Sequence, residues 1–296
     1  MTAAWSAERV RRPVVALGGI AVLYLAGLLT GCGNESRPTP TEEKAAAVPV
    51  LTWERVRREP FPRTAFTQGL LLRAGKLWLS TGQYGESTVQ EIDLASGEVL
   101  QRLDLPETVF GEGLAMLGDT LYQLTWQNQI CYLYQAQPLK LTGRFSYEGE
   151  GWGLASNGQE LAMSNGSAQI AMRDPETFEV TRRLSVRGPS GTVTRLNELE
   201  FVGGLLLANV WHQDRVVVID SDNGRVLAEL DFRALTEEAV GPRAGERVLN
   251  GLAWDAAGQQ LWVAGKEWPW IYAVRVDWGE LAARGSGLPV VAPDGQ

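Results

Sequence analysis

One position that recurs along the chain carries residue types able to do acid–base chemistry. It stands directly before a Gly-Leu pair or a close variant, and successive copies are 44, 40, 45 and 53 residues apart. The residues at this position are Gln68, Glu112, Trp152, Asn197 and Asn250. Glu112 is the one acid among them. A carboxyl group between apolar walls has a raised pKa and can both accept and return a proton. We therefore expect Glu112 to transfer protons.

A second set of side chains follows the next apolar segment of each copy. If that segment is a strand antiparallel to the first, its end lies near the start of the first strand. Trp126, Trp211 and Lys266 stand at such ends. We expect them to border one pocket, with Trp126, Trp152 and Trp211 as its walls and the other tryptophans in the core. A simpler alternative for Glu112 is an ion pair with Lys266, and both roles can hold together.

The composition excludes several other chemistries. The chain has one histidine, His212, which argues against a His-rich zinc site, and no Gly-x-Ser-x-Gly elbow accompanies it. No phosphate-binding Gly-x-x-x-x-Gly-Lys loop occurs, and the net charge of -8 argues against nucleic acid as a partner. We therefore predict no metal and no cofactor. Cys131 lies in an apolar segment and is expected to be a buried structural thiol.

The spacing of the copies predicts the fold, since a period of about 40–45 residues is typical of one four-stranded propeller blade. Second strands are expected at residues 76–80, 120–125, 160–164, 205–210 and 260–264, and third strands at 88–94, 129–134, 169–173, 215–220 and 270–276. The last copy lacks a fourth strand, whereas the segment 50–56 precedes the first copy. We predict an all-β, five-bladed propeller over residues 50–278, closed by this N-terminal strand in the last blade. The alternative is an open β-solenoid.

The N-terminal residues 1–32 are predicted to lie outside the fold. Arg9, Arg11 and Arg12 precede the apolar segment Val14–Leu29, a pattern typical of an export signal. The sequence Leu29-Thr30-Gly31-Cys32 resembles a bacterial lipobox, which predicts lipidation at Cys32 and an exported protein anchored to the cell envelope. The alternative is a transmembrane anchor. Residues 33–49 are expected to form a flexible linker, and residues 279–296 a C-terminal tail.

Nine short motifs, taken in order, resemble the plant-type glutaminyl cyclases, which also occur in bacteria. They are Ala65-Phe66-Thr67-Gln68-Gly69-Leu70, Ser80-Thr81-Gly82-Gln83-Tyr84-Gly85, Phe110-Gly111-Glu112-Gly113-Leu114, Gln123-Leu124-Thr125-Trp126, Gly149-Glu150-Gly151-Trp152-Gly153-Leu154, Leu196-Asn197-Glu198-Leu199-Glu200, Ala208-Asn209-Val210-Trp211, Val248-Leu249-Asn250-Gly251 and Gly265-Lys266-Glu267-Trp268-Pro269. The resemblance extends from about Trp53 to Asp277. One departure is Leu79, where members of the family often have Glu.

The resemblance implies a metal-independent five-bladed propeller that converts an N-terminal glutamine into pyroglutamate and releases ammonia. It implies that Glu112 transfers the proton. It further implies that the pocket is built by Phe66, Gln68, Trp126, Trp152, Asn197, Trp211 and Lys266. We expect Lys266 and Asn197 to assist catalysis and Asn250 to contact the substrate.

Two alternatives remain open at this stage. Calcium-dependent lactonases also place Glu and Asn at a propeller axis, where Glu112, Asn197 and Asn250 could imitate them. A non-catalytic propeller that serves as a binding platform is the other. If the protein is a cyclase, its substrates are peptide or protein N-terminal glutamines, with free glutamine as a further candidate. We expect it to act as a monomer.

Overall fold

The computed structural model describes residues 47–242 and 245–283, all within the compact unit Lys44–Gln296. The predicted signal sequence, Cys32, the linker up to residue 46 and the tail beyond residue 283 lie outside the described residues. Within the described part, no helix is long and apolar enough to cross a membrane.

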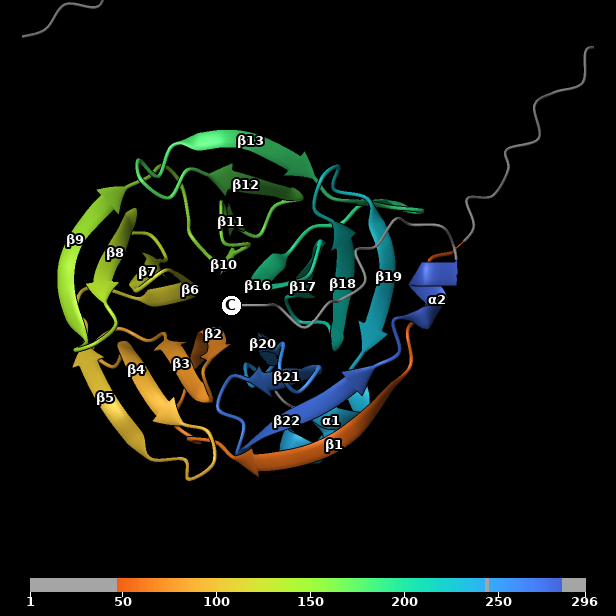
Figure 1. The fold of residues 1–296 in the computed structure, drawn as a ribbon, viewed down its shortest axis with the longest axis horizontal. Coiled ribbons are helices and arrows are strands. Elements are labelled where there is room, and N and C mark those ends of the chain that lie inside the picture. The colour runs from red at the N-terminus through yellow and green to blue at the C-terminus, as the bar shows by residue number, and fades with distance from the viewer. Residues whose placement is uncertain (1–46, 243–244, 284–296) are drawn as a thin grey trace, which may run out of the picture. The chain divides into compact units, whose positions relative to one another are not determined.

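Five four-stranded antiparallel sheets are arranged as the blades of a ring (Figure 1). Blade 1 contains β2 (Thr67–Arg73), β3 (Lys76–Thr81), β4 (Thr88–Asp93) and β5 (Val99–Asp104). Blade 2 contains β6 (Gly111–Leu117), β7 (Thr120–Thr125), β8 (Ile130–Gln135) and β9 (Lys140–Ser146). Blade 3 contains β10 (Leu154–Ser156), β11 (Leu161–Met163), β12 (Gln169–Arg173) and β13 (Val180–Ser185).

The remaining blades follow the same plan. Blade 4 contains β16 (Leu196–Val202), β17 (Leu205–Val210), β18 (Arg215–Asp220) and β19 (Val226–Asp231), after a small hairpin of β14 (Arg187–Gly188) and β15 (Gly191–Thr192). Blade 5 contains β20 (Leu249–Asp255), β21 (Gln260–Gly265), β22 (Trp270–Val276) and β1 (Trp53–Pro60). The described residues also form two helices, α1 (Arg233–Val240) and α2 (Gly279–Ala283). The predicted five-bladed fold is thus confirmed.

The N-terminal strand β1 closes the ring by pairing antiparallel with β22, from Trp53 opposite Val276 to Pro60 opposite Trp270. It begins three residues later than predicted because the preceding segment is used elsewhere. Leu51 donates its backbone N–H to the carbonyl of Glu229 on β19, and Val50 forms an isolated parallel bridge with Glu229. The N-terminal segment therefore contacts both blade 4 and blade 5.

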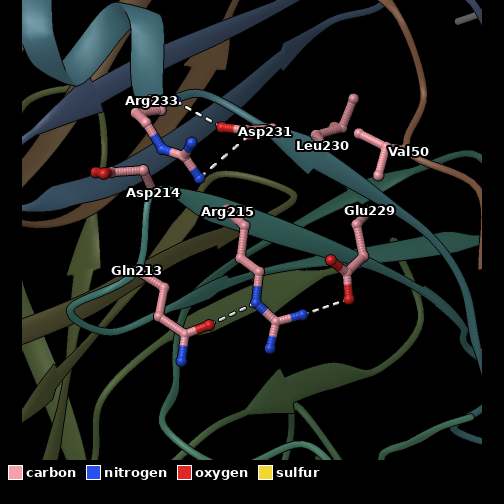
Figure 2. Close-up of a pocket in the computed structure, with 8 residues that line it drawn as sticks. All are labelled: Val50, Gln213, Asp214, Arg215, Glu229, Leu230, Asp231 and Arg233. Atoms are coloured by element: carbon pink, nitrogen blue, oxygen red, sulfur yellow. Dashed lines mark hydrogen bonds and ion pairs between the residues drawn. The ribbon is translucent and has the colours of Figure 1, made fainter. Parts of the chain in front are cut away.

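A surface hollow of about 360 Å³ lies beside this junction, and its charged side chains are largely paired with one another (Figure 2). Arg215 bonds to Glu229 and to Gln213, and the Arg233 guanidinium lies 3.6 Å from the Asp231 carboxylate. Because these arginines already have partners, the hollow is a weak candidate for capturing a charged ligand.

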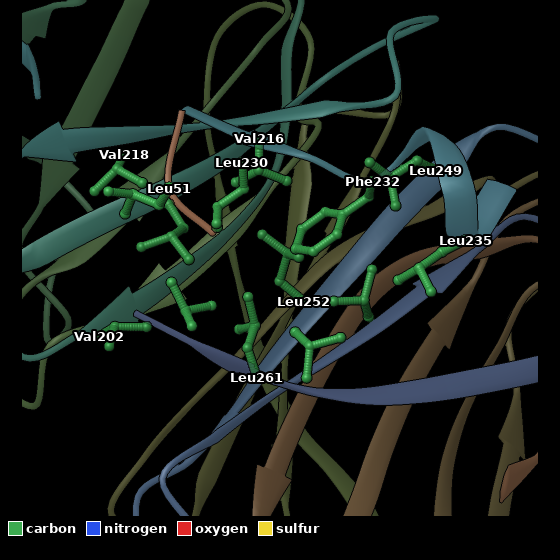
Figure 3. Close-up of a cluster of buried hydrophobic side chains, with 14 of the residues drawn as sticks. Leu51, Val202, Val216, Val218, Leu230, Phe232, Leu235, Leu249, Leu252 and Leu261 are labelled. Atoms are coloured by element: carbon green, nitrogen blue, oxygen red, sulfur yellow. The ribbon is translucent and has the colours of Figure 1, made fainter. Parts of the chain in front are cut away.

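The hydrophobic core is divided into five clusters, one at each interface between neighbouring blades. The largest joins blades 4 and 5 and includes Leu51, Phe232 and Leu235 (Figure 3). Leu281 of α2 is also buried there, so the segment predicted as a tail begins with a turn of helix that packs on the domain. Cys131 is fully buried in the cluster between blades 2 and 3, and burial raises the pKa of its thiol.

Glycine at the ring axis is required by close packing of the inner strands. A Cβ at Gly69 would lie 2.3 Å from the backbone nitrogen of Leu114, one at Gly113 2.4 Å from that of Leu154, and one at Gly153 2.0 Å from the carbonyl of Asn197. Real Cβ atoms do not approach backbone so closely, so these blades can meet only where the side chain is absent. This explains the glycine of the repeat.

Blade 4 has Glu198 at the corresponding position. Its fully buried carboxylate accepts hydrogen bonds from the backbone N–H groups of Leu70 (3.3 Å) and Leu252 (2.9 Å), which belong to the inner strands of blades 1 and 5. Burial raises the pKa of Glu198 well above its usual value, and the nearby charge of Glu200 adds to the rise. Glu198 therefore links three blades at the axis.

We expect Glu198→Ala to lower the free energy of unfolding by about 2 kcal/mol or more, because it leaves two buried N–H donors without an acceptor. Urea-induced unfolding of the domain measures the loss. Glu148→Ala is the control, since it removes an exposed carboxyl group in the loop between β9 and β10. Equal unfolding midpoints for Glu198→Ala and the unmodified domain would show that the axial bonds contribute no net stability.

Candidate active site

A cavity of about 440 Å³ opens at the end of the ring axis where the inner strands begin. It is lined by Phe66, Gln68, Gln83, Phe110, Glu112, Trp126, Trp152, Asn197, Trp211, Glu246, Lys266 and Glu267. Eight of the nine candidate site residues from the sequence are among them. The exception is Asn250, which is fully buried but does not line the cavity.

Two recurring places in the blades supply these side chains. Gln68, Glu112 and Asn197 lie near the start of β2, β6 and β16, at points where pairing with the next strand is irregular. A bulge interrupts the alternation of side chains between the two faces of a sheet and can direct a side chain toward a functional site. Trp126, Trp211 and Lys266 each come directly after the last residue of a second strand, namely β7, β17 and β21.

The Glu112 carboxyl group is held by a short chain of amides. Gln68 donates from Nε2 to Oε1 of Glu112 at 2.9 Å. Asn250 donates from Nδ2 to Oε1 of Gln68 at 3.2 Å and to the carbonyl of Thr67 at 3.0 Å. Asn250 thereby fixes which end of the Gln68 amide faces Glu112. It was expected to contact the substrate, but the structure places it behind Gln68, next to Gly251 with its φ of 127°.

The electrostatic environment favours the protonated form of Glu112. Burial raises the pKa of Glu112 well above its usual value, the charge of Lys266 opposes this rise, and the charge of Glu150 adds to it. Burial also lowers the pKa of Lys266, while the charge of Glu112 opposes that change. The Lys266 ammonium lies 4.6 Å from the centre of the Phe66 ring, a cation–π contact.

Aromatic rings form the walls of the cavity. Phe110 contacts Phe66, Tyr84 and Trp126 with ring centroids 6.1, 5.5 and 5.8 Å apart. Trp152 meets Trp211 edge-on, with centroids 5.4 Å apart and planes at 81°. Edge-to-face contacts of this kind hold rings in defined orientations.

Two glycines allow these rings to lie against the backbone. A Cβ at Gly82 would be 2.3 Å from Cε1 of Phe110, and one at Gly166 would be 2.7 Å from Cη2 of Trp152. Both glycines belong to the segments that follow second strands, so the same loops that supply some walls support others.

Four lining residues were not predicted from the sequence: Gln83, Phe110, Glu246 and Glu267. A signal for Phe110 was present, because it precedes Glu112 by two residues just as Phe66 precedes Gln68. Gln83 and Glu267 have positive φ angles of 89° and 55° in tight loops, which a strand pattern does not reveal. Among residues 47–242 and 245–283, no group of three His, Cys, Asp or Glu side chains is arranged to hold a metal ion.

Fold and cavity together define a five-bladed propeller whose axial pocket holds a buried acid between aromatic walls. The model of the glutamine cyclotransferase family matches residues 27–276. A glutaminyl-peptide cyclotransferase of Arabidopsis thaliana is 37% identical over 230 residues, which cover 75% of this chain and 71% of that one. The crystal structure of Myxococcus xanthus glutaminyl cyclase superposes with a TM-score of 0.73 and 32% identity, over 78% of this chain and 99% of that one.

The chain therefore belongs to the glutamine cyclotransferase family. This assignment agrees with the resemblance seen in the motifs, and it favours glutamine cyclisation over the lactonase and binding-platform alternatives.

We expect Gly166→Ala to raise KM for a glutaminyl dipeptide about 10-fold, which corresponds to a loss of about 1.4 kcal/mol in binding. The added methyl group would displace the Trp152 ring. Gly158→Ala is a matched control, because Gly158 also has a positive φ (88°) but a Cβ there meets nothing within 4 Å. Both variants pay a backbone cost of about 1–2 kcal/mol. Kinetics of ammonia release compare them, and an equal KM in the two variants would contradict the assigned role of Gly166.

Proposed function

We propose that this protein is a glutaminyl-peptide cyclotransferase in which Glu112 carries a proton from the attacking amine to the departing ammonia. The observation that carries the proposal is the buried Glu112 carboxyl group, fixed by Gln68 inside an aromatic cavity. A carboxyl group with a raised pKa exchanges protons more readily near neutral pH than an ordinary one.

The reaction forms one C–N bond and breaks another. The neutral α-amine of the substrate attacks its own γ-carboxamide carbon, and ionised Glu112 accepts a proton from the attacking nitrogen. The tetrahedral intermediate then collapses. Glu112 returns the proton to the former amide nitrogen, which leaves as ammonia, and the five-membered lactam remains. Glu112 ends in the protonation state in which it began, so the cycle needs no external acid.

Asn197 and Lys266 are the donors we assign to the oxygen that gains charge in the intermediate. Both line the same cavity as Glu112, and both are nearly buried. Donors fixed in a water-poor site stabilise a developing oxyanion without having to reorient during the reaction. Lys266 can donate an N–H even when its lowered pKa leaves the amine neutral.

The aromatic walls are assigned to folding the substrate. A glutamine side chain must bend back on itself before its amine reaches the carboxamide, and confinement supplies that orientation. Walls formed by Trp126, Trp152, Trp211 and the two phenylalanines also exclude water, which would otherwise compete as the nucleophile and yield glutamate. The volume of about 440 Å³ is within the range of small-ligand sites.

The substrates we propose are N-terminal glutamines of peptides or proteins, with free glutamine as a further candidate, and the acting species is a monomer. We also propose that the protein is exported and anchored to the cell envelope by lipid on Cys32. The support for the anchor is the Leu29-Thr30-Gly31-Cys32 pattern after a basic and apolar segment.

We expect Glu112→Gln to lower kcat by about 10²–10⁴-fold while the fold is retained, because the amide cannot exchange the proton. Ammonia release from a glutaminyl dipeptide measures the rate, and the melting temperature reports the fold. Glu91→Gln serves as the control, since Glu91 is another buried acid that lies outside the cavity. A Glu112→Gln enzyme that keeps most of its turnover would remove Glu112 from the mechanism.

Cys32→Ala in the full chain, expressed in a bacterial host, should move the protein from the membrane fraction to the soluble fraction, because acyl chains supply the membrane affinity. Cys131→Ala is the control, since this buried cysteine has no access to lipid. Equal membrane association of the two variants would contradict lipid anchoring at Cys32.

A further inference from the structure

Glu150 does not line the cavity itself, but it bonds to Trp152, which does, and it has no role in the mechanism above. It precedes Trp152 by two residues, and its side chain is half-buried. Its Oε2 accepts a hydrogen bond from the indole Nε1 of Trp152 at 3.0 Å. Its Oε1 accepts one from Nε2 of Gln127 at 3.1 Å. Both carboxylate oxygens are therefore engaged, although the residue is accessible to solvent.

The partners of Glu150 come from two blades. Trp152 belongs to blade 3, whereas Gln127 follows Trp126 in the loop after β7 of blade 2. Burial tends to raise the pKa of Glu150, but hydrogen bonds from the side chains of Trp152, Gln127 and Trp126 outweigh it and hold the pKa below its usual value. The carboxylate thus stays ionised and interacts with both of the tryptophan walls that flank it.

The hydrogen bond to Glu150 adds a polar restraint to the packing of the Trp152 indole. The ring packs over Gly166 and meets Trp211 edge-on, and these contacts hold the plane of the ring. A charge-assisted hydrogen bond to Nε1 selects one orientation of the ring.

We propose that Glu150 is a positioning residue, which holds the Trp126 and Trp152 walls together across the blade 2–blade 3 interface and so sets the shape of the glutamine pocket. The proposal rests on the proposed cyclotransferase function. It has a second consequence, because the negative charge of Glu150 also contributes to the raised pKa of Glu112. The same residue therefore affects both the fit of the substrate and the pH range of catalysis.

Substitutions at Glu150 separate its effect on the fit of the substrate from its effect on the pKa of Glu112. Glu150→Ala removes the acceptor and the charge, whereas Glu150→Gln removes the charge but keeps one oxygen that can accept from an indole. Glu148→Gln is the matched control, because Glu148 is the same residue type two positions earlier in the same loop and is exposed, whereas Glu150 is half-buried. KM, kcat and the pH profile for a glutaminyl dipeptide are measured for each enzyme.

We expect Glu150→Ala to raise KM about 10-fold with a smaller effect on kcat, and Glu150→Gln to restore KM to within about 3-fold of the unmodified enzyme. In Glu150→Gln the acid limb of the pH profile should move to lower pH. The negative charge of Glu150 raises the pKa of Glu112. Without that charge the pKa of Glu112 falls, and Glu112 ionises at lower pH. Glu148→Gln should change neither quantity. An unchanged KM in Glu150→Ala, or an acid limb in Glu150→Gln that does not move, would overturn the proposal.

A readout that needs no turnover separates this proposal from the function itself. In protein labelled with ¹⁵N-tryptophan, the indole N–H signal of Trp152, assigned from a Trp152→Phe variant, should shift in Glu150→Ala and stay in place in Glu148→Gln. No ammonia release by the unmodified enzyme would overturn the cyclotransferase function. An unshifted indole signal would overturn the positioning role whether or not the enzyme is active.

Discussion

The inner strands of neighbouring blades approach so closely at the ring axis that no side chain fits between them. Gly69, Gly113 and Gly153 satisfy this constraint, and each is followed by a leucine that enters the core. The position before the glycine is then the last from which a side chain can reach the axial cavity. Gln68, Glu112 and Trp152 stand there. The geometry of the site is thus a direct consequence of how the ring closes.

Blade 4 is the exception, because it has no glycine at this position. Glu198 occupies the glycine position, and its carboxylate extends to the backbone of blades 1 and 5 instead of being excluded. A buried acid is unfavourable unless its oxygens are satisfied, and here two N–H groups that would otherwise lack partners satisfy them. Glu198 and Glu112 are therefore buried acids with different partners. Glu198 bonds to backbone and stabilises the ring, whereas Glu112 bonds to one amide and faces a cavity that admits substrate.

Much of this arrangement could be predicted from the sequence, because it repeats. The five copies predict the blades, the ring closure by the N-terminal strand, and the two columns from which seven lining residues come, whereas Phe66 was expected from the family resemblance. The predictions were less accurate where the chain leaves the repeat. The closing strand begins at Trp53 because Leu51 bonds to blade 4, and Asn250 lies behind Gln68 even though it stands in the same column as Glu112. Alignment of blades shows equivalent positions but not contacts between blades. It therefore assigned no role to Glu150, although Glu150 stands within one of the motifs that carry the family resemblance.

Those contacts between blades are what hold the cavity together. Gln68 and Glu112 join blades 1 and 2, Gln127 and Glu150 join blades 2 and 3, and Trp152 and Trp211 join blades 3 and 4. The remaining interfaces are spanned by His212 with Glu246, 3.8 Å apart, and by Lys266 over the Phe66 ring. Each of these interfaces also contains one of the five hydrophobic clusters, so apolar packing and a contact between loops or strand ends act at the same interface. The side chains of the pocket can be held accurately in this fold because each blade contacts its neighbour at this end of the ring. At the interface of blades 2 and 3 that contact is made by the Glu150 carboxylate, which interacts with the indoles of Trp126 and Trp152.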